Sequence, residues 1–359
     1  DTGTETDTGT ETDTVTETDT VTETDTVTET DTVTETGTDT GTGTGTDGTG
    51  REYDMNVPMG WAVIPKYSTE TTTGGGGGEV VDVSNSGDFS AAVSDDVPRI
   101  VRFSGSISGK IEIGSNKTVL GVGADATIKG QLNVQERTNV IIRNFNISGG
   151  TDGIGISTDT TYVWVDHCSL SSCGDGLLDL KRRSDCYTLT WIHYFDHNKC
   201  NLLNSGSRDY DDRGFINGTL HHNFYDGTVQ RNPRAGFGMI HIFNDYNYQN
   251  SQYGIGFHTE SKVFAEKNYF HDMENSINQM YNAPGYDPEE LGDCLAEDNF
   301  FENASGDEST GIGFDPNEYY VYDFVLDEAQ AVKEIVKAGA GTGAEWGDIG
   351  LIPIPGQGL

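Results

Sequence analysis

Three aspartates near the middle of the chain have the chemistry to bind a hard metal cation. Asp166, Asp175 and Asp179 fall within one short stretch, which also contains Gly174 and Gly176. Carboxylate oxygens are the ligands that calcium prefers in proteins. We therefore predict that these three aspartates form a calcium site.

Basic side chains gather directly after these aspartates. Residues 181–234 contain eight basic and six acidic side chains, whereas the full chain has 21 basic and 58 acidic ones and a formal net charge of −37. A locally positive strip beside a divalent cation can capture an anionic polymer despite the overall repulsion. The acidic balance excludes a nucleic-acid binder, which needs a basic face to displace counterions.

The elements that must position this chemistry are short β-branched and aromatic runs broken by Gly, Asn and Asp. A strand-bearing repeat without intervening helices is typical of a parallel β-solenoid, whose stacked rungs bury a continuous core. The alternative, an antiparallel sandwich, would need hairpin turns about every 8–12 residues, and such signals are scarce. The predicted rung ends lie 22 to 30 residues apart along the chain: Ile147, Leu170, Phe195, Tyr225, Asn247 and Phe270.

Stacking of the rungs predicts which side chains meet. Residues at similar distances past successive rung ends occupy the same turn, about 4.8 Å apart. Asp175, Lys199 and Arg231 each lie four to six residues past a rung end. We therefore expect an acid and two bases to project from one side of three consecutive rungs, with Asp179 further along the turn and Asp166 in the strand of the same rung.

The two ends of the chain depart from the repeat. In residues 1–55, Thr alternates mainly with Asp, Glu and Gly over most of the segment, and no apolar face forms. We predict a disordered, acidic stalk there, followed by one domain at residues 56–359; a calcium-binding or adhesive repeat is the alternative for the stalk. Residues 327–337 carry a helical pattern with acids first and Lys337 last. Residues 272–315 are expected to have little regular structure.

Two further features narrow the class of protein. No apolar run approaches about 18 residues, so no membrane span is predicted. The five cysteines lack the spacing of a zinc site and allow at most two disulfides: Cys168, Cys173, Cys186, Cys200 and Cys294.

Several ordered segments resemble the signature blocks of family 1 pectate lyases, a strong signal because the blocks occur together and in order. The resemblance covers roughly residues 60–345. The central blocks are Trp164–His167, Asp175–Asp179, Asp196–Lys199 and Gln230–Gly238. The flanking blocks are Thr73–Glu79, Ile111–Gly123, Asn139–Arg143 and Ala331–Ala340.

The resemblance implies a right-handed, single-stranded parallel β-helix and calcium-dependent β-elimination on polygalacturonate. It assigns Asp166, Asp175 and Asp179 as calcium ligands. It assigns Lys199 to the uronate carboxylate and Arg231 as the base that removes the proton. His167 is interpreted as a hydrogen-bonded structural residue.

One position departs from the family pattern. The resemblance predicts a second arginine two residues before Phe-Gly, and this chain has Gly236 there. Arg234 shares a strand face with position 236 and is therefore predicted to replace the missing arginine in part. We expect weaker binding or a shifted substrate preference.

The sequence thus predicts a calcium-dependent pectate lyase that releases 4,5-unsaturated oligogalacturonates from de-esterified polygalacturonate. Guanidinium groups lose their proton only at high pH, so an alkaline rate optimum is expected. The alternatives are a lyase acting on esterified pectin or another uronan, and a non-catalytic uronan-binding β-helix. The enzyme is expected to be monomeric, and to be secreted or tethered to the cell surface through its stalk.

Overall fold

The computed structural model describes residues 44–46, 52–54, 56–67, 71–282, 285, 290–320 and 326–343. Thr40–Leu359 form one compact unit. Within the predicted stalk the described residues are strands β1 (Thr44–Thr46) and β2 (Glu52–Asp54), which pair in antiparallel fashion. The rest of the stalk lies outside the described residues, and its boundary at residue 55 stays a prediction.

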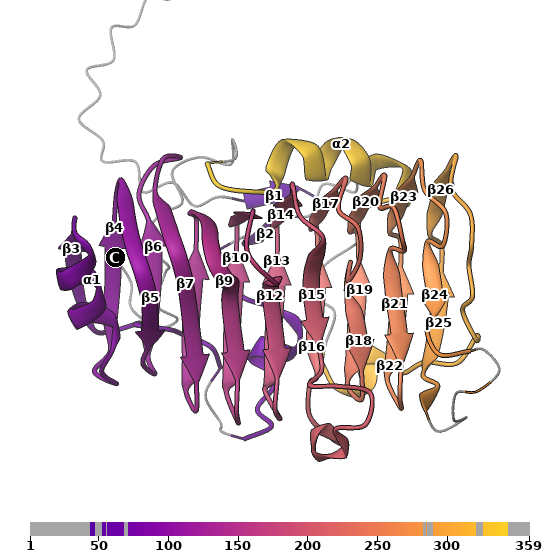
Figure 1. Cartoon of the computed structure of the whole chain (residues 1–359), viewed down its shortest axis with the longest axis horizontal. Helices are drawn as coiled ribbons and strands as arrows, with labels where there is room; N and C mark the ends of the chain where they lie inside the picture. The colour runs from indigo at the N-terminus through magenta and orange to yellow at the C-terminus, as the bar shows by residue number, and fades with distance from the viewer. Residues whose placement is uncertain are drawn as a thin grey trace, which may run out of the picture. The chain divides into compact units, whose positions relative to one another are not determined.

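The strands that follow coil into a right-handed parallel β-helix, which confirms the predicted fold (Figure 1). Its first face is a ten-stranded sheet in which each strand pairs in parallel with the strand one coil away. Along the chain, these strands are β3 (Glu79–Val83), β4 (Arg99–Phe103), β6 (Lys117–Gly121), β8 (Thr138–Arg143), β10 (Thr161–Asp166), β13 (Asp185–Thr190), β16 (Gly218–His221), β19 (Met239–Phe243), β22 (Lys262–Glu266) and β25 (Asp293–Glu297).

A fourteen-stranded sheet supplies the other two faces. It begins with the long strands β5 (Ser106–Ile113), β7 (Thr127–Gln135) and β9 (Asn146–Ser157). The C-terminal half of β9 leads into the second face: β12 (Gly176–Lys181), β15 (Lys199–Leu203), β18 (Arg234–Gly236), β21 (Ile255–His258) and β24 (Ile277–Gln279). Its N-terminal half leads into the third face: β11 (Ser169–Ser171), β14 (His193–Phe195), β17 (Phe224–Asp226), β20 (Tyr246–Tyr248), β23 (Tyr269–His271) and β26 (Phe300–Glu302).

The predicted rung ends fall on one ladder of the third face, with a single shift. Leu170 of β11 pairs with Ile147 of β9 on one side and with Tyr194 of β14 on the other, so Tyr194 and not Phe195 is the equivalent residue. The ladder continues through Tyr225, Asn247 and Phe270. The repeat length read from the sequence therefore corresponds to the coil of the solenoid.

One expectation about the later part of the chain is wrong. Residues 272–315 contain three strands, β24, β25 and β26, which extend the same three faces. β25 pairs with β22 from Lys262–Asp293 to Glu266–Glu297, and β26 pairs with β23. These strands have three to five residues each, too short to show a clear hydrophobic period in the sequence, yet Ile277, Cys294 and Phe301 join the apolar core. The backbone hydrogen bonds of the ladder extend them.

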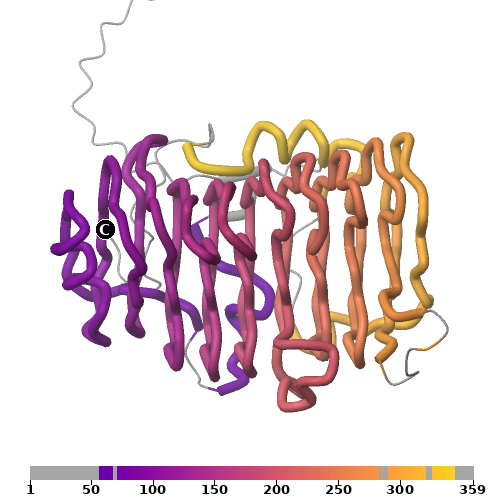
Figure 2. Tube along the Cα trace, viewed as in Figure 1, coloured from indigo at the N-terminus to yellow at the C-terminus, as the bar shows by residue number. Residues whose placement is uncertain are grey.

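The predicted C-terminal helix is confirmed as α2 (Ala329–Gly339). The chain returns along the solenoid after its last coil, and α2 lies against the third face (Figure 2). Val332 and Val336 of α2 pack with the aromatic rings of Phe224, Tyr246 and Tyr269. The helix thus covers an aromatic ladder that would otherwise face water.

Other short elements close the core. Phe89 and Val93 of α1 (Ser86–Val93) join the main apolar cluster at the N-terminal end of the solenoid. The segment with η1 (Gly60–Val63) places Trp61 against the first face, and the ring of Tyr319, after η4 (Pro316–Glu318), packs on it in a tilted arrangement with the centroids 5.3 Å apart. η2 (Tyr210–Asp212) belongs to the loop between β15 and β16. All five cysteines are free, and no helix among the described residues is long and apolar enough to cross a membrane.

An internal amide ladder crosses the solenoid and contains one carboxyl group. Asn223, Asn268 and Asn299 each accept a backbone N–H from the preceding coil and donate to a backbone carbonyl, those of Leu189, Ile242 and Ala265. Asp245 occupies the position of this ladder between Asn223 and Asn268. Its Oδ1 accepts from the Asn223 backbone N–H at 2.7 Å, while its buried Oδ2 has no hydrogen-bond partner among the described residues. Burial raises the pKa of Asp245 well above its usual range, and the hydrogen bonds from Asn223 offset only part of this effect.

We expect Asp245→Asn to stabilise the protein at neutral pH. The folded-state pKa of Asp245 is raised, so this carboxyl group contributes most to the free energy of unfolding at pH values below about 3.9. This contribution to stability is lost as the pH rises toward the folded-state pKa. Burial makes the ionised form of this carboxyl group costly, and an uncharged amide of the same shape avoids that cost. Melting temperatures of both proteins between pH 4 and pH 8 should diverge as the pH rises, and parallel curves would contradict this account.

Candidate active site

The second face brings together four of the residues that the sequence singles out. Lys199 of β15 pairs with Gly176 of β12 and forms a bridge to Gln230 in the next coil. Asp175 precedes Gly176 and Arg231 follows Gln230, so Asp175, Lys199 and Arg231 lie on or directly beside one ladder. The predicted meeting of an acid and two bases on three consecutive rungs is therefore present in the structure.

Asp179 lies three residues after Gly176 on β12, where it pairs with Leu202 of β15, and Leu202 pairs in turn with Arg234 of β18. Its carboxylate is buried and folds back over Gly176, where a Cβ would lie 2.4 Å from Asp179 Oδ1. Oδ1 accepts the backbone N–H of Leu202 at 3.1 Å, and Oδ2 forms an ion pair with Lys181 Nζ at 2.7 Å without the alignment of a hydrogen bond. Burial raises the pKa of Asp179, and the Lys181 ammonium counters part of this rise.

Asp175 is more exposed and is held by the predicted lysine. Lys199 Nζ donates to Asp175 Oδ1 at 2.5 Å, and this hydrogen bond lowers the pKa of Asp175 below its usual range. His197 contacts the backbone carbonyl of Asp175 through Nε2 at 2.6 Å. The Asp175 carboxylate is thus ionised at neutral pH.

Arg231 brings its guanidinium to the same group of carboxylates. Its Nη1 lies 3.6 Å from Asp179 Oδ2, an ion-pair distance beyond hydrogen-bond range. Nε and Nη1 are both buried and donate no hydrogen bond to any residue the structure describes. Buried donors without partners are costly, so this guanidinium is prepared to bind or react with a ligand.

The structure adds one aspartate that sequence reasoning missed. Asp152 of β9 lies one coil before Asp175, and its Oδ1 accepts the Gly176 backbone N–H at 3.0 Å. Its negative charge contributes to the raised pKa of Asp179, so the two carboxylates interact. Its position about one coil before Asp175 in the sequence was the available signal.

The structure does not bring Asp166 to this group, and its prediction as a calcium ligand is corrected here. Asp166 ends β10 on the first face, where its buried carboxylate accepts from Arg143 Nε at 2.6 Å and from Thr190 Oγ1 at 2.6 Å. His167 Nδ1 lies 2.7 Å from the same carboxylate. Burial alone would raise the pKa of Asp166, but the charges of His167 and Arg143 hold it below its usual range. This carboxylate is committed to an internal ion pair, and His167 has the structural role predicted for it.

We expect Asp166→Asn to lower stability and leave calcium binding intact. The substitution takes the counter-charge from the buried Arg143 guanidinium, and loss of one partner of a buried pair costs about 3–5 kcal/mol. The carboxylate of Asp166 has a lowered pKa, so its contribution is present above about pH 3.9 and fades as the pH falls through the folded-state value. Chemical denaturation of both proteins at pH 7 tests this, and an unchanged unfolding free energy would contradict it.

The oxygen donors on the second face fit a hard divalent cation in their chemistry. Asp152, Asp175 and Asp179 offer carboxylates from neighbouring coils, and the buried Asp179 Oδ2 accepts no hydrogen bond. Among the described residues, no three acidic, His or Cys side chains converge around a single point. Lys199 and Lys181 instead neutralise Asp175 and Asp179, so a cation would have to displace these ammonium groups.

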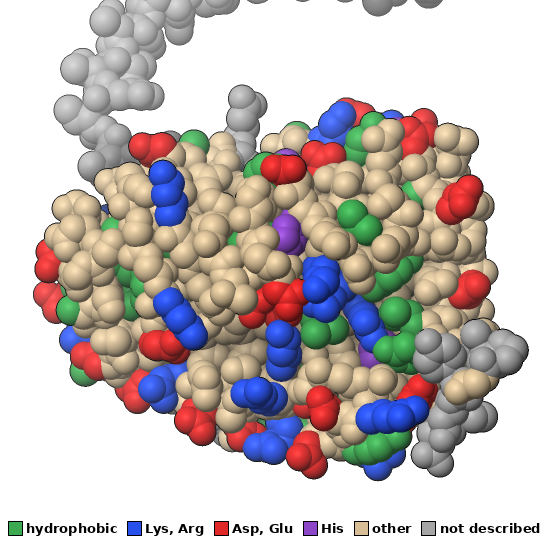
Figure 3. Space-filling view, viewed as in Figure 1, with side chains coloured by type: hydrophobic (Ala, Val, Ile, Leu, Met, Phe, Trp, Pro, Cys, Tyr) green, Lys and Arg blue, Asp and Glu red, His purple; other side chains and the backbone are tan. Residues whose placement is uncertain are grey.

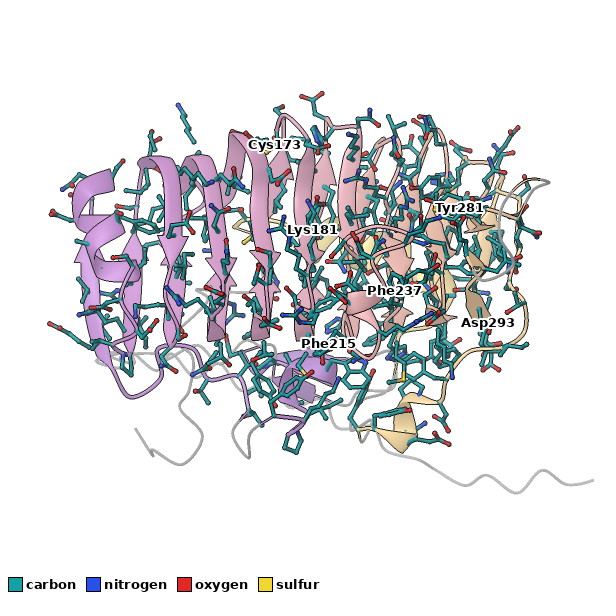
Figure 4. The ribbon with its side chains drawn as sticks, turned by 60° about the horizontal axis from the view of Figure 1, so that its bottom comes forward. Cys173, Lys181, Phe215, Phe237, Tyr281 and Asp293 are labelled. Atoms are coloured by element: carbon teal, nitrogen blue, oxygen red, sulfur yellow. The ribbon has the colours of Figure 1, made fainter. Side chains whose placement is uncertain are left out.

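Arg234 extends the cationic part of the face toward the later coils. It begins β18, and its Nε donates to His258 Nε2 at 3.3 Å, while its Nη2 contacts the Tyr281 hydroxyl. Figure 3 shows basic and acidic side chains gathered side by side near the middle of this view. In Figure 4, Lys181 lies near the middle of the solenoid and Tyr281 nearer its C-terminal end.

Comparison with known proteins gives one consistent result. The family model described as pectate lyase matches residues 55–345. The chain is 31% identical over 296 residues to a pectate trisaccharide-lyase of Bacillus licheniformis, covering 76% of this chain and 83% of the relative. It is 29% identical over 326 residues to a pectate trisaccharide-lyase of Thermotoga maritima, covering 80% of this chain and 88% of the relative.

A similar fold occurs in a crystal structure of a Bacillus pectate lyase in complex with trigalacturonate. The two share 23% sequence identity and superpose with a TM-score of 0.70, over 80% of this chain and 99% of the other. This likeness supports the β-helix itself.

Proposed function

This chain belongs to the pectate lyase family and is a polysaccharide lyase, and from that premise we propose that it cleaves de-esterified polygalacturonate by calcium-dependent β-elimination. The observation that carries the proposal is the meeting of Asp152, Asp175, Asp179, Lys199 and Arg231 on four consecutive coils. The relatives named as pectate lyases and the neighbour in complex with trigalacturonate support the substrate class.

Substrate binding falls to the cationic side chains. Lys199 and Arg234 would each engage a uronate carboxylate, since both side chains are partly exposed on the same face. Lys199 would have to leave Asp175 to do so. Asp152, Asp175 and Asp179 would hold calcium, which when bound would neutralise uronate charge and acidify the adjacent carbon-bound proton.

Arg231 would carry out the proton abstraction. After its guanidinium has lost a proton to solvent, the neutral guanidine would take the proton from C5 of the uronate, the C–H electron pair would form the C4–C5 double bond, and the glycosidic bond at C4 would break. The leaving oxygen is protonated by solvent, and the product is a 4,5-unsaturated oligogalacturonate. Because a guanidinium releases its own proton only at high pH, the rate should rise toward alkaline pH.

The proposal is tested by the absorbance of the unsaturated products. Polygalacturonate incubated with the protein should give rising ultraviolet absorbance from the conjugated double bond of the product with calcium present, and no rise with excess chelator. Equal or faster cleavage of methyl-esterified pectin would favour the alternative substrate. If the protein is retained on pectate but does not cleave it, the result would support a non-catalytic binding protein and contradict lyase activity on this polymer.

We also propose that the enzyme acts as a monomer outside the cell, since its proposed substrate is an extracellular polymer. Tethering through the Thr-rich segment remains a prediction, because most of that segment lies outside the described residues. Gel filtration and fractionation of the producing cells would test both statements.

A further inference from the structure

Arg234 contacts two side chains of later coils, His258 and Tyr281. Its Nε donates to His258 Nε2 at 3.3 Å, and its Nη2 contacts the hydroxyl of Tyr281. The guanidinium carbon also lies 5.5 Å from the centroid of the Tyr281 ring, within the range of a cation–π contact. Two sides of the guanidinium are therefore fixed, and its remaining N–H groups donate no hydrogen bond to a residue that the structure describes.

The missing side chain at position 236 makes this arrangement possible. Gly236 pairs with His258 in the ladder, and a Cβ on Gly236 would lie 2.8 Å from His258 Cε1 and 3.2 Å from Asn204 Cβ. Any side chain at position 236 would therefore push against the imidazole that receives Arg234. Burial, with a smaller effect of Arg234, lowers the pKa of His258 to about 3, so the ring is neutral and able to accept the hydrogen bond.

Tyr281 differs from His258 because it is partly exposed. It follows β24, two coils beyond the β18 strand that carries Arg234, and its ring meets the edge of the His258 ring at 5.2 Å and 68°. The tyrosine therefore reaches Arg234 from the solvent side of the same face. Preorganising an arginine in this way removes rotamer entropy that substrate binding would otherwise have to overcome.

We propose that Tyr281 is a positioning residue that holds Arg234 as the second carboxylate-binding cation of this face, in place of a side chain at position 236. The inference rests on the proposed function, since it concerns how the same site binds an anionic uronate polymer. Tyr281 acts through Arg234 and has no part in the proton transfer. Its contribution belongs to substrate affinity.

The test is a double-mutant cycle on polygalacturonate cleavage with Tyr281→Phe and Arg234→Ala. Phenylalanine keeps the ring and removes the hydroxyl that Arg234 contacts. Tyr281→Phe should raise KM about 3- to 10-fold and change kcat less than about 2-fold, since one charged hydrogen bond is lost. In the Arg234→Ala background the same substitution should have almost no further effect, because interacting residues are not additive.

Tyr248→Phe is the matched control, because Tyr248 is a partly exposed tyrosine on the third face. It should leave both constants unchanged, and the melting temperatures of all single variants should agree closely. A Tyr281→Phe variant with wild-type KM overturns the proposal, as does an equal loss with and without Arg234. A wild-type protein that leaves polygalacturonate intact contradicts the proposed function itself, which separates the two failures.

Discussion

Arg231→Ala should reduce the rate of polygalacturonate cleavage by about 10²- to 10⁴-fold, the range for removal of a positioned general base. The buried Nε and Nη1 of Arg231 donate no hydrogen bond to the described residues, and its ion-pair contact is the long one to Asp179. Little folding energy depends on such contacts. The loss should therefore appear in kcat, with a melting temperature close to that of the wild type.

Arg102→Ala is the matched control for this substitution. Arg102 lies in β4 and pairs with Asp82 at 2.6 Å on the first face, away from the candidate site. It should retain full activity. Arg231→Lys provides a second readout: any residual activity should peak at lower pH, because an ammonium group releases its proton more readily than a guanidinium. Wild-type kcat in Arg231→Ala would contradict the assignment of the base.

Asp179→Asn and Asp152→Asn should each weaken calcium binding at least about 100-fold, because each removes a charged oxygen ligand of the proposed site. Lyase activity should then require much more calcium. Asp179→Asn also removes a buried carboxylate whose pKa is raised by burial, so this variant should fold at least as well as the wild type at neutral pH. Isothermal titration with calcium chloride measures both affinities.

Two aspartates outside the site serve as controls for calcium binding. Asp166→Asn lies in the internal pair with Arg143, and Asp159→Asn breaks a surface pair with Arg183. Both should bind calcium as tightly as the wild type, although Asp166→Asn unfolds more easily. Loss of calcium binding in Asp166→Asn with binding kept in Asp152→Asn would restore the ligand set expected from the sequence.

The fold was predictable because its information is local and repeated. Each coil buries apolar side chains at the same place, so the period of the hydrophobic runs equals the period of the ladder. The sequence predicts Phe195 as a rung end, whereas Tyr194 is the residue on the ladder. A three-residue strand such as β14 is too short for the alternation of side chains to fix its register. β25 and β26 were missed for a related reason, since their pairing comes from neighbouring coils.

The candidate site was predictable in part. Asp175, Lys199 and Arg231 follow rung ends at similar distances, and this spacing survives in three dimensions. Asp166 and Asp179 each follow an apolar residue directly (Val165 and Leu178), and nothing local identifies which of the two is a metal ligand. The three-dimensional structure is needed to show that Asp166 lies on the first face, paired with Arg143. It also shows that Asp152, from the preceding coil, lies on the second face near Asp179.

The contacts of Arg234 could not be read from the sequence. His258 and Tyr281 lie 24 and 47 residues away along the chain and reach Arg234 because their coils stack on it. Gly236 was visible as a departure from the family pattern. Its physical consequence, space for the His258 ring, depends on a ladder partner that composition does not reveal.

A crystal structure of the Arg231→Ala variant grown with calcium chloride and trigalacturonate would test the site most directly. Anomalous scattering should place calcium within about 2.3–2.6 Å of carboxylate oxygens of Asp152, Asp175 and Asp179. A uronate carboxylate should contact Lys199, which would have left Asp175. Calcium bound at Asp166 on the first face, or a trisaccharide lying away from the second face, would contradict the account.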